Sequence, residues 1–329
     1  MGTINLLELK PTRISRNLRG KYMLFYGLPK IGKTTLLTKF PKSLILEFET
    51  GTNALNNAYV QPISKWTEAK AVLRELRKEP VKEKFYTVCV DTADVAWSLC
   101  EKYICQQNEV QNIGDIPYGK GYAMCKQEFE EYFREIAMLG YGIIFTSHST
   151  EKSMKDEKGN DYISLAPALP QRPYDIINKM VDIIGYIRSI KNYDTGEQKT
   201  FLFLRGDDRF VAGSRFKFIE PRVEFSYEAL RDAICDAVDK QVELDGTGKA
   251  TEDYNNFYQP AQERTYEEIK AEAEKLWTEL VIEPNNAAMA DKILLIVEKI
   301  FKKKINLSEI TEAQKDLFEL VVAEMKLLK

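Results

Sequence analysis

The sequence predicts an α/β fold with a mainly parallel sheet, an antiparallel extension of that sheet and a small C-terminal helical module. Three observations support this prediction. Apolar strand segments alternate with helical segments from residue 21 to residue 149, a pattern typical of parallel sheets covered on both faces. Later apolar segments are joined by polar turns, which indicates antiparallel pairing. Beyond residue 263 only helical periodicity remains.

Four apolar segments account for the parallel part of the expected sheet. They are "KYMLFYG" (21–27), "SLILEFETG" (43–51), "FYTVCVDTAD" (85–94) and "YGIIFTSHS" (141–149). The helical segments that separate them are 32–40, which Pro41 ends, 64–79, with Ser64 as its N-cap, 93–110 and 123–139. A Gly-rich loop is expected at 111–122.

The second half of the core begins with a polar, charged loop over residues 149–162. Antiparallel strands are then expected in "MVDIIGYIRSI", "KTFLFLRG" and "RFKFIE", and the helix "SYEALRDAICDAVDKQ" ends the core. The predicted domains are a core over residues 1–242, a linker over 243–262 and a helical module over 263–329. The linker is polar and lacks periodicity, whereas the module has three helical stretches at 264–281, 285–303 and 311–328.

Composition restricts the classes of protein to which the chain can belong. The net charge of -3 over 329 residues argues against a protein that coats nucleic acid over its whole surface. Residues 1–42 nevertheless hold nine Lys or Arg and one Glu, so a local site for a polyanion is expected there. The alternative is that these basic residues form only a solvated surface and supply the lysines that bind phosphate.

Cysteine usage and hydropathy indicate a cytoplasmic protein. The five cysteines include no CxxC pair, and we interpret them as reduced thiols rather than disulfides or a zinc site. No apolar run approaches the ~18 residues of a membrane span, so no membrane partner is expected. The first residues also lack the features of an export signal.

The stretch "FYGLPKIGKTT" matches the phosphate-binding pattern G-x-x-x-x-G-K-[ST] and lies between an apolar strand and a helix. Its glycines let main-chain N–H groups turn inward toward phosphate, Lys33 supplies a countercharge and the Thr34 hydroxyl binds Mg²⁺. The expected ligands are ATP and Mg²⁺. The residues expected to bind the nucleotide are Gly27, Leu28, Pro29, Lys30, Ile31, Gly32, Lys33, Thr34 and Thr35.

A second acid is needed to hold the metal, and Asp91 provides it. Asp91 ends the apolar run "TVCVD", so its carboxylate is expected at the carboxyl edge of the sheet, where such folds bind their ligands. The alternative is that Asp91 only caps the helix that follows. The predicted metal ligands are therefore Thr34 and Asp91.

Hydrolysis also needs a group that polarises the attacking water. "LEFETG" places Glu47 and Glu49 at the end of the neighbouring strand, where residues two apart point the same way. Glu49 lies further toward the edge, so we expect it to be the base, with Glu47 as the alternative. His148, the only histidine, follows "IIFTS" and is expected to sense the γ-phosphate, although a lone histidine is often structural.

Together these motifs resemble the RecA-type ATPase core. They are more closely similar to short RecA-core ATPases of bacteriophages, which include AAA-domain nucleotide-binding proteins and single-strand annealing recombinases of the Rad/RecA superfamily. The resemblance covers about residues 15–240 and rests on "YGLPKIGKTT", "LEFETG", "CVDTAD", "YGKGY", "IIFTSHS" and "RGDDRF". The chain departs from the family pattern at Lys30 and Ile31, where a small residue is usual. His148 stands where bacterial RecA has Gln.

The resemblance implies a RecA-like P-loop NTPase that hydrolyses ATP with Mg²⁺ and acts on single-stranded DNA in phage recombination or annealing. It also implies a homo-oligomer in the cytoplasm of a bacterial host, with a single-strand-binding protein or another replication protein as a candidate partner. Lys33, Glu49 and His148 are the expected catalytic residues. A basic residue from the next subunit should complete the site, and Arg205 and Arg215 are equal candidates.

The family's DNA-contacting loops correspond to residues 106–122 and 149–167. Their lysines and tyrosines suit phosphate contact and base stacking, but acidic residues dilute the charge, so solvated loops are the alternative. These lysines and tyrosines are Tyr118, Lys120, Tyr122, Lys152, Lys155 and Lys158.

Two other functions are weighed against this one. A RecA-core ATPase that acts on a protein partner in phage replication or packaging fits the same motifs, and the C-terminal module would then be a docking tail. A small-molecule kinase or GTPase is disfavoured, because the chain lacks an Asn-Lys-x-Asp motif and an obvious Arg-rich lid.

Overall fold

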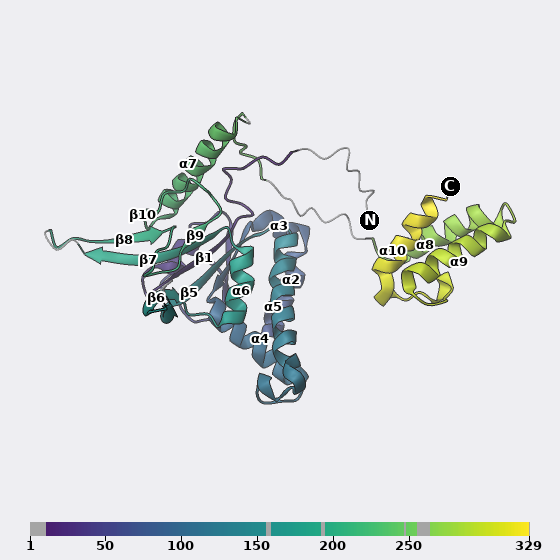
Figure 1. Ribbon diagram of the computed structural model, residues 1–329, viewed down its shortest axis with the longest axis horizontal. Helices are drawn as coiled ribbons and strands as arrows, with labels where there is room; N and C mark the ends of the chain where they lie inside the picture. The colour runs from purple at the N-terminus through teal and green to yellow at the C-terminus, as the bar shows by residue number, and fades with distance from the viewer. Residues whose placement is uncertain (1–10, 156–158, 192–194, 247, 255–263, 329) are drawn as a thin grey trace. The chain divides into compact units, whose positions relative to one another are not determined.

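The computed structural model describes residues 11–155, 159–191, 195–246, 248–254 and 264–328. The chain divides into two compact units, of which the first covers Pro11–Gln259 and the second includes Pro260–Lys329 (Figure 1). Among the described residues, the first unit contains the sheet and the second is helical. Each unit therefore buries the apolar faces of its own elements.

One sheet runs through the first unit in the order β10-β8-β7-β1-β5-β4-β2-β3. Its strands are β1 (Tyr22–Gly27), β2 (Ser43–Glu47), β3 (Tyr59–Pro62), β4 (Thr87–Asp91), β5 (Gly142–Lys155), β7 (Ile183–Lys191), β8 (Gln198–Phe203) and β10 (Arg222–Glu224). Off this path, β6 (Asp161–Pro167) pairs with β5, and β9 (Gly213–Ser214) pairs with β7.

The pairs from β7 through β1, β5, β4 and β2 to β3 are parallel. The pairs that involve β6, β8, β9 or β10 are antiparallel. The expected fold class, a mainly parallel sheet with an antiparallel extension and a C-terminal helical part, is therefore confirmed. A strand, β5, lies between β1 and β4, so the two strands that end at Gly27 and Asp91 are not direct neighbours.

Helices cover both faces of the sheet because successive side chains of a strand point to opposite sides. Leu24 and Tyr26 of β1 join the core on the side of α2 (Trp66–Leu76), α4 (Ala93–Gln107), α5 (Lys120–Met138) and α6 (Gln171–Met180). Met23 and Phe25 join the core beneath α1 (Lys33–Leu37) and α7 (Tyr227–Asp245). Figure 1 shows α7 on one side of the sheet and α2, α5 and α6 on the other.

The polar stretch 149–162, expected to be a loop, is instead a hairpin. β5 continues through Lys155 and pairs with β6 from Ser149 opposite Pro167 to Lys155 opposite Asp161. Polar residues form a strand here because the ladder with β6 satisfies their peptide groups, and the buried side chains Ser164 and Ala166 lie on β6. Sequence alternation carries no signal for such a strand.

Residues 215–220, expected to be a strand, are irregular between β9 and β10. The guanidinium of Arg205 donates to the carbonyl oxygens of Ser214, Phe216 and Lys217, at 3.0, 2.7 and 3.0 Å. Those carbonyl groups all point toward one side chain. In a strand, successive carbonyl groups would instead point in alternating directions toward the neighbouring strands. The alternating apolar residues of this segment therefore imitate a strand.

Besides β6 of the hairpin, the elements that were not anticipated include β3, β9, β10, the short helix α3 (Glu79–Lys84) and α6. The expected loop at 111–122 contains two 3₁₀ turns, Ile113–Asp115 and Pro117–Gly119, before α5 begins at Lys120. These segments are short or rich in Pro and Gly, so periodicity is weak in each.

The second unit packs α8 (Tyr266–Trp277), α9 (Ala287–Phe301) and α10 (Lys315–Lys326) around a core that includes Ile269, Val297 and Val321. Thr265 caps α8, because its hydroxyl accepts from the Glu268 N–H. None of the described helices is both long and apolar enough to cross a membrane.

The expected boundaries at 242/243 and 262/263 stay predictions, and the structure adds contacts of the expected linker. Part of the stretch expected to be a linker lies against the first unit. Thr251 N donates to Ile14 O at 3.2 Å and Arg16 N donates to Thr251 O at 3.0 Å. The side chain of Arg16 also pairs with Asp239 and Glu252.

Gly206 is expected to be intolerant of a side chain. A Cβ there would lie 2.6 Å from Ala212 N and 2.7 Å from Phe210 O, both main-chain atoms. Gly206→Ala should lower the free energy of unfolding by about 1–3 kcal/mol because the backbone must shift. Gly213→Ala is the matched control, since its Cβ would meet nothing within 4 Å. Equal urea midpoints for the two variants would contradict this account.

Candidate nucleotide-binding site

The phosphate-binding loop connects the carboxyl end of β1 to α1. Lys30 has φ 64° and Gly32 has φ 102°, so the chain curls through left-handed conformations twice within three residues. A Cβ at Gly27 would lie 2.7 Å from Ile187 O on the adjacent strand β7. Both glycines of the motif are thus required by the backbone path, and the loop has the curl that phosphate binding needs.

Lys33 extends into this loop. Its Nζ donates to Gly27 O at 3.0 Å and to Leu28 O at 2.9 Å, and the residue is only 6 % exposed. Burial lowers the pKa of Lys33, whereas the carboxylates of Asp91, Glu49 and Asp94 raise it. An ammonium held by neutral carbonyls is well placed to accept an anionic ligand.

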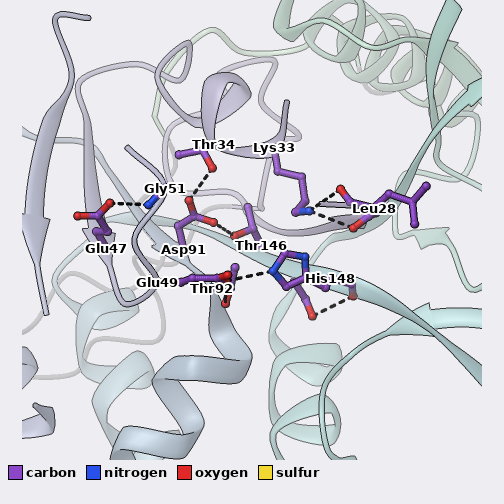
Figure 2. A network of polar contacts seen from close by, with 12 residues as sticks. Leu28, Lys33, Thr34, Glu47, Glu49, Gly51, Asp91, Thr92, Thr146 and His148 are labelled. Carbon is purple, nitrogen blue, oxygen red and sulfur yellow. Dashed lines mark hydrogen bonds and ion pairs between the residues drawn. The ribbon is translucent and has the colours of Figure 1, made fainter. Parts of the chain in front are cut away.

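Asp91 is held between two hydroxyl groups. Thr34 Oγ1 donates to Asp91 Oδ2 at 2.7 Å, and Thr146 Oγ1 contacts Oδ1 and also lies 3.2 Å from Val90 O. Asp91 is 4 % exposed, and the peptide bond between Asp91 and Thr92 is cis. Figure 2 shows these side chains converging from α1, β4 and β5. The structure thus brings both predicted metal ligands together.

The donor set fits Mg²⁺ rather than a metal held by many side chains. Mg²⁺ prefers oxygen ligands and usually takes one or two carboxylates together with phosphate oxygens and water. One carboxylate and one hydroxyl meet here. Among the described residues, no group of three or more His, Cys, Asp or Glu side chains could hold a metal by itself.

Glu49 and His148 form the second polar cluster of the site. His148 Nε2 lies 3.1 Å from Glu49 Oε2, and Thr92 Oγ1 donates to the same oxygen at 3.1 Å. His148 is paired in register with Gly27, so it lies beside the start of the phosphate-binding loop. Its Nδ1 is buried and has no hydrogen-bond partner within the part of the chain described.

Glu47 and Glu49 do not point the same way, contrary to expectation (Figure 2). The amides of Phe48 and Glu49 both donate to Asp91 O, at 2.8 and 3.1 Å, which is the arrangement of a bulge. The extra residue breaks the alternation after β2 ends. Glu47 Oε1 accepts from the amides of Gly51 and Thr52 and from the Thr52 hydroxyl, whereas Glu49 faces His148.

Sequence reasoning missed three residues of the site: Thr92, Thr146 and Asp94. Thr146 is a polar residue within an apolar strand, a signal that could have identified it. Asp94 lies in the first turn of α4, and its Oδ1 is buried without a partner among the described atoms. Burial raises the pKa of Asp94, and the charge of Glu49 adds to that effect.

The residues expected to contact DNA lie in three elements, and Lys120 and Tyr122 belong to α5. Tyr118, 95 % exposed, lies in the 3₁₀ turn before α5, and Arg172 stacks over Tyr122 at 4.1 Å. Lys152 lies in β5, with its Nζ 5.2 Å from the Tyr174 ring centroid, and Lys155 ends that strand. Lys158 lies outside the described residues. The role of these residues stays a prediction.

The two arginines considered as contributors to a neighbouring subunit make contacts within their own chain. Arg205 binds three carbonyls, as described above. Arg215 donates to Asp182 Oδ1 at 3.1 Å and to Lys179 O at 2.6 Å. Neither contact tests the prediction, but each gives the arginine a structural role.

The sheet order, the phosphate-binding loop and the buried acid beside Thr34 define a P-loop nucleotide-binding protein. Residues 19–216 match the family model described as an AAA domain. Because this match covers more than half of the chain, the chain belongs to that family. The matched region lies within the first unit.

Two individual proteins are similar to this chain. The SPbeta prophage-derived uncharacterized protein YorG of Bacillus subtilis (strain 168) is 27% identical over 330 residues, with 98% of both chains covered. The flagellar accessory protein FlaH of Methanocaldococcus jannaschii is 12% identical, and the match covers 56% of this chain and 77% of FlaH at a TM-score of 0.33.

Glu47 is expected to stabilise the fold rather than take part in chemistry. Burial raises its pKa, but the hydrogen bonds from Thr52 and Gly51 lower it by more, so the pKa of Glu47 lies below its ordinary value. A depressed pKa stabilises the folded state fully above the ordinary value, and this contribution is lost as pH falls through the folded pKa. Glu47→Gln should therefore lower the free energy of unfolding by about 1–2 kcal/mol at pH 7.

The deficit of Glu47→Gln should shrink as pH falls below the ordinary glutamate pKa of about 4.3, and it should be lost as pH falls through the lower folded pKa. Urea unfolding from pH 7 down to about pH 3 measures this, with Glu130→Gln on the exposed side of α5 as the control. A deficit that does not change with pH would show that the carboxylate charge plays no part.

Proposed function

We propose that the chain is a Mg²⁺-dependent ATPase that acts on single-stranded DNA during phage recombination or single-strand annealing, as a homo-oligomer in the cytoplasm of a bacterial host. The observation that supports it best is the course of β5. That one strand contains Thr146, which contacts the acid Asp91, and His148, which contacts Glu49. It then continues into the hairpin that bears Lys152 and Lys155.

The phosphate-binding loop and the residues around Asp91 suit triphosphate binding. The loop from Gly27 to Thr35 would surround the phosphates, with Lys33 as their countercharge. Thr34 and Asp91 would hold Mg²⁺, which when bound neutralises charge on the β- and γ-phosphates.

Glu49 is the base that we assign for hydrolysis. It is 43% exposed at the side chain and accepts hydrogen bonds through Oε2, so a water molecule can approach it. Glu47 is occupied by the turn at 51–52. His148 positions the Glu49 carboxylate and would respond to the γ-phosphate from its place beside Gly27.

The DNA assignment draws on the hairpin and on the relative of prophage origin. Lysines contact backbone phosphate and aromatic residues stack on bases, and Lys152, Lys155 and the exposed Tyr118 supply both kinds of group. A single-strand-binding protein or another replication protein is a further candidate partner.

A protein target is the second candidate function. Ile163 on β6 is 65 % exposed on the same hairpin. An apolar side chain at that place favours contact with a protein surface. The ATPase would then act in phage replication or packaging.

Glu49→Gln is expected to retain nucleotide binding and to lower ATP turnover by roughly 10²–10⁴-fold, because the water loses its proton acceptor. Binding of a fluorescent ATP analogue and release of phosphate measure the two properties separately. Lys33→Ala is the comparison, since it should lose both. If Glu47→Gln abolishes turnover and Glu49→Gln does not, the assignment of the base is wrong.

ATP turnover is expected to rise several-fold when single-stranded DNA is added. The double variant Lys152→Gln/Lys155→Gln should lose that stimulation and keep its basal rate, because its charges lie on the hairpin and not around the phosphates. Lys78→Gln/Lys82→Gln removes two charges near α3 and is the matched control. Turnover that ignores DNA, together with no binding to an oligonucleotide, would favour the protein target instead.

A further inference from the structure

A second cavity lies at the amino-terminal edge of the sheet, the edge opposite the phosphate-binding loop. Its volume is about 370 Å³, within the usual range of ligand sites. The walls come from residues 12–22, which lead into β1, from Asp182 just before β7, and from Arg215, Phe216 and Tyr254. All of these residues belong to the first unit.

Positive charge exceeds negative charge in this cavity. Four cationic side chains line it, and Asp182 is the single acidic residue among its lining residues. The Asp182 carboxylate is already engaged, because Oδ2 accepts from Tyr22 N at 3.0 Å and Oδ1 accepts from Arg215 Nη1 at 3.1 Å. The four cations are Arg13, Arg19, Lys21 and Arg215.

Two aromatic rings hold the Arg19 guanidinium in place. Its guanidinium carbon lies 3.7 Å from the ring centroid of Tyr86 and 4.4 Å from that of Tyr254. Its Nε is buried and has no hydrogen-bond acceptor among the described residues. Aromatic rings contact the faces of a guanidinium and leave its edge of N–H donors to bind an acceptor. A phosphate matches that edge with two parallel hydrogen bonds.

Lys21 adds a second cation that lacks a full set of partners. Its Nζ donates to Ser15 O at 3.1 Å and lies 5.2 Å from the Phe216 ring centroid. Burial lowers the pKa of Lys21, and Asp182 offsets only part of that effect. A bound anion would restore the solvation that this ammonium has lost.

We propose that this cavity binds the phosphate group of a nucleotide, either free or within a single strand of nucleic acid, with Arg19 and Lys21 as its principal ligands. Part of the excess of basic residues in the first 42 positions lies in the phosphate-binding loop. Another part, Arg13, Arg19 and Lys21, lines this cavity. The cavity lies at the far ends of β1 and β7 from the ATP site, so both sites could be filled together.

Binding should be measured in the Lys33→Ala background, where the ATP site no longer retains nucleotide. The probes are a labelled oligo-dT strand, dTMP and inorganic phosphate. Arg19→Gln and Lys21→Gln should each weaken binding of the responding probe about tenfold. For the strand, each should also reduce the slope of log affinity against log salt by about 0.7.

Arg231→Gln is the matched control, because it removes the same charge from α7 and does not line the cavity. It should leave binding unchanged. Thermal unfolding identifies any variant that fails to fold. If Arg19→Gln fails to fold, Lys21→Gln still tests the proposal.

The response of the probes identifies the source of the phosphate. If Arg19→Gln and Lys21→Gln weaken binding of the oligonucleotide only, the phosphate belongs to a nucleic-acid strand. If they also weaken binding of dTMP or inorganic phosphate, the cavity binds a free ligand. Binding that survives both variants, an equal loss in Arg231→Gln, or no binding of any probe by the Lys33→Ala parent would each overturn the proposal. The first two outcomes overturn this proposal and leave the proposed function standing, whereas the third would also count against single-stranded DNA as the target of the ATPase.

Discussion

The contact of Asp91 with two threonine hydroxyls is the interaction on which the nucleotide site depends. Thr34 comes from α1 and Thr146 from β5, so a single carboxylate joins three elements that are distant in the sequence. A buried carboxylate is tolerated only where its oxygens are satisfied. Parallel pairing of β1, β5 and β4 brings these groups to one edge, and the apolar residues that precede them on each strand hold that edge in place.

The sequence predicted the parts of the site that lie at the ends of apolar strands. Gly27, Asp91 and His148 each follow a buried run, and parallel strands end at a common edge, so their proximity could be anticipated. The relation between Glu47 and Glu49 could not be predicted. It depends on two successive amides that share the carbonyl of Asp91, a contact between strands that no periodicity within one strand reveals.

The difference between contacts within one strand and contacts between distant segments also explains which predictions of secondary structure were wrong. In the hairpin of β5 and β6, Glu151, Ser153 and Lys155 are exposed, and backbone pairing with β6 defines the strand that contains them. Residues 215–220 have the alternation of a strand, yet the guanidinium of Arg205 gathers their carbonyls. In both places a long-range polar contact decides the conformation, whereas hydrophobic pattern reports only which side chains are buried.

The hairpin is attached to the nucleotide site at both of its ends. Ser149 follows His148 directly, and Ala168, just after β6, donates its N–H to His148 O at 2.7 Å. A shift of the His148 backbone would therefore move both strands of the hairpin together. His148 in turn contacts Glu49 through Nε2, so under the proposed function a change at the γ-phosphate would reach the lysines of β5 through this contact. The basic cavity at the opposite edge borders the beginnings of β1 and β7. A ligand there would influence turnover only through the strands themselves, which are rigid on the scale of a packed core.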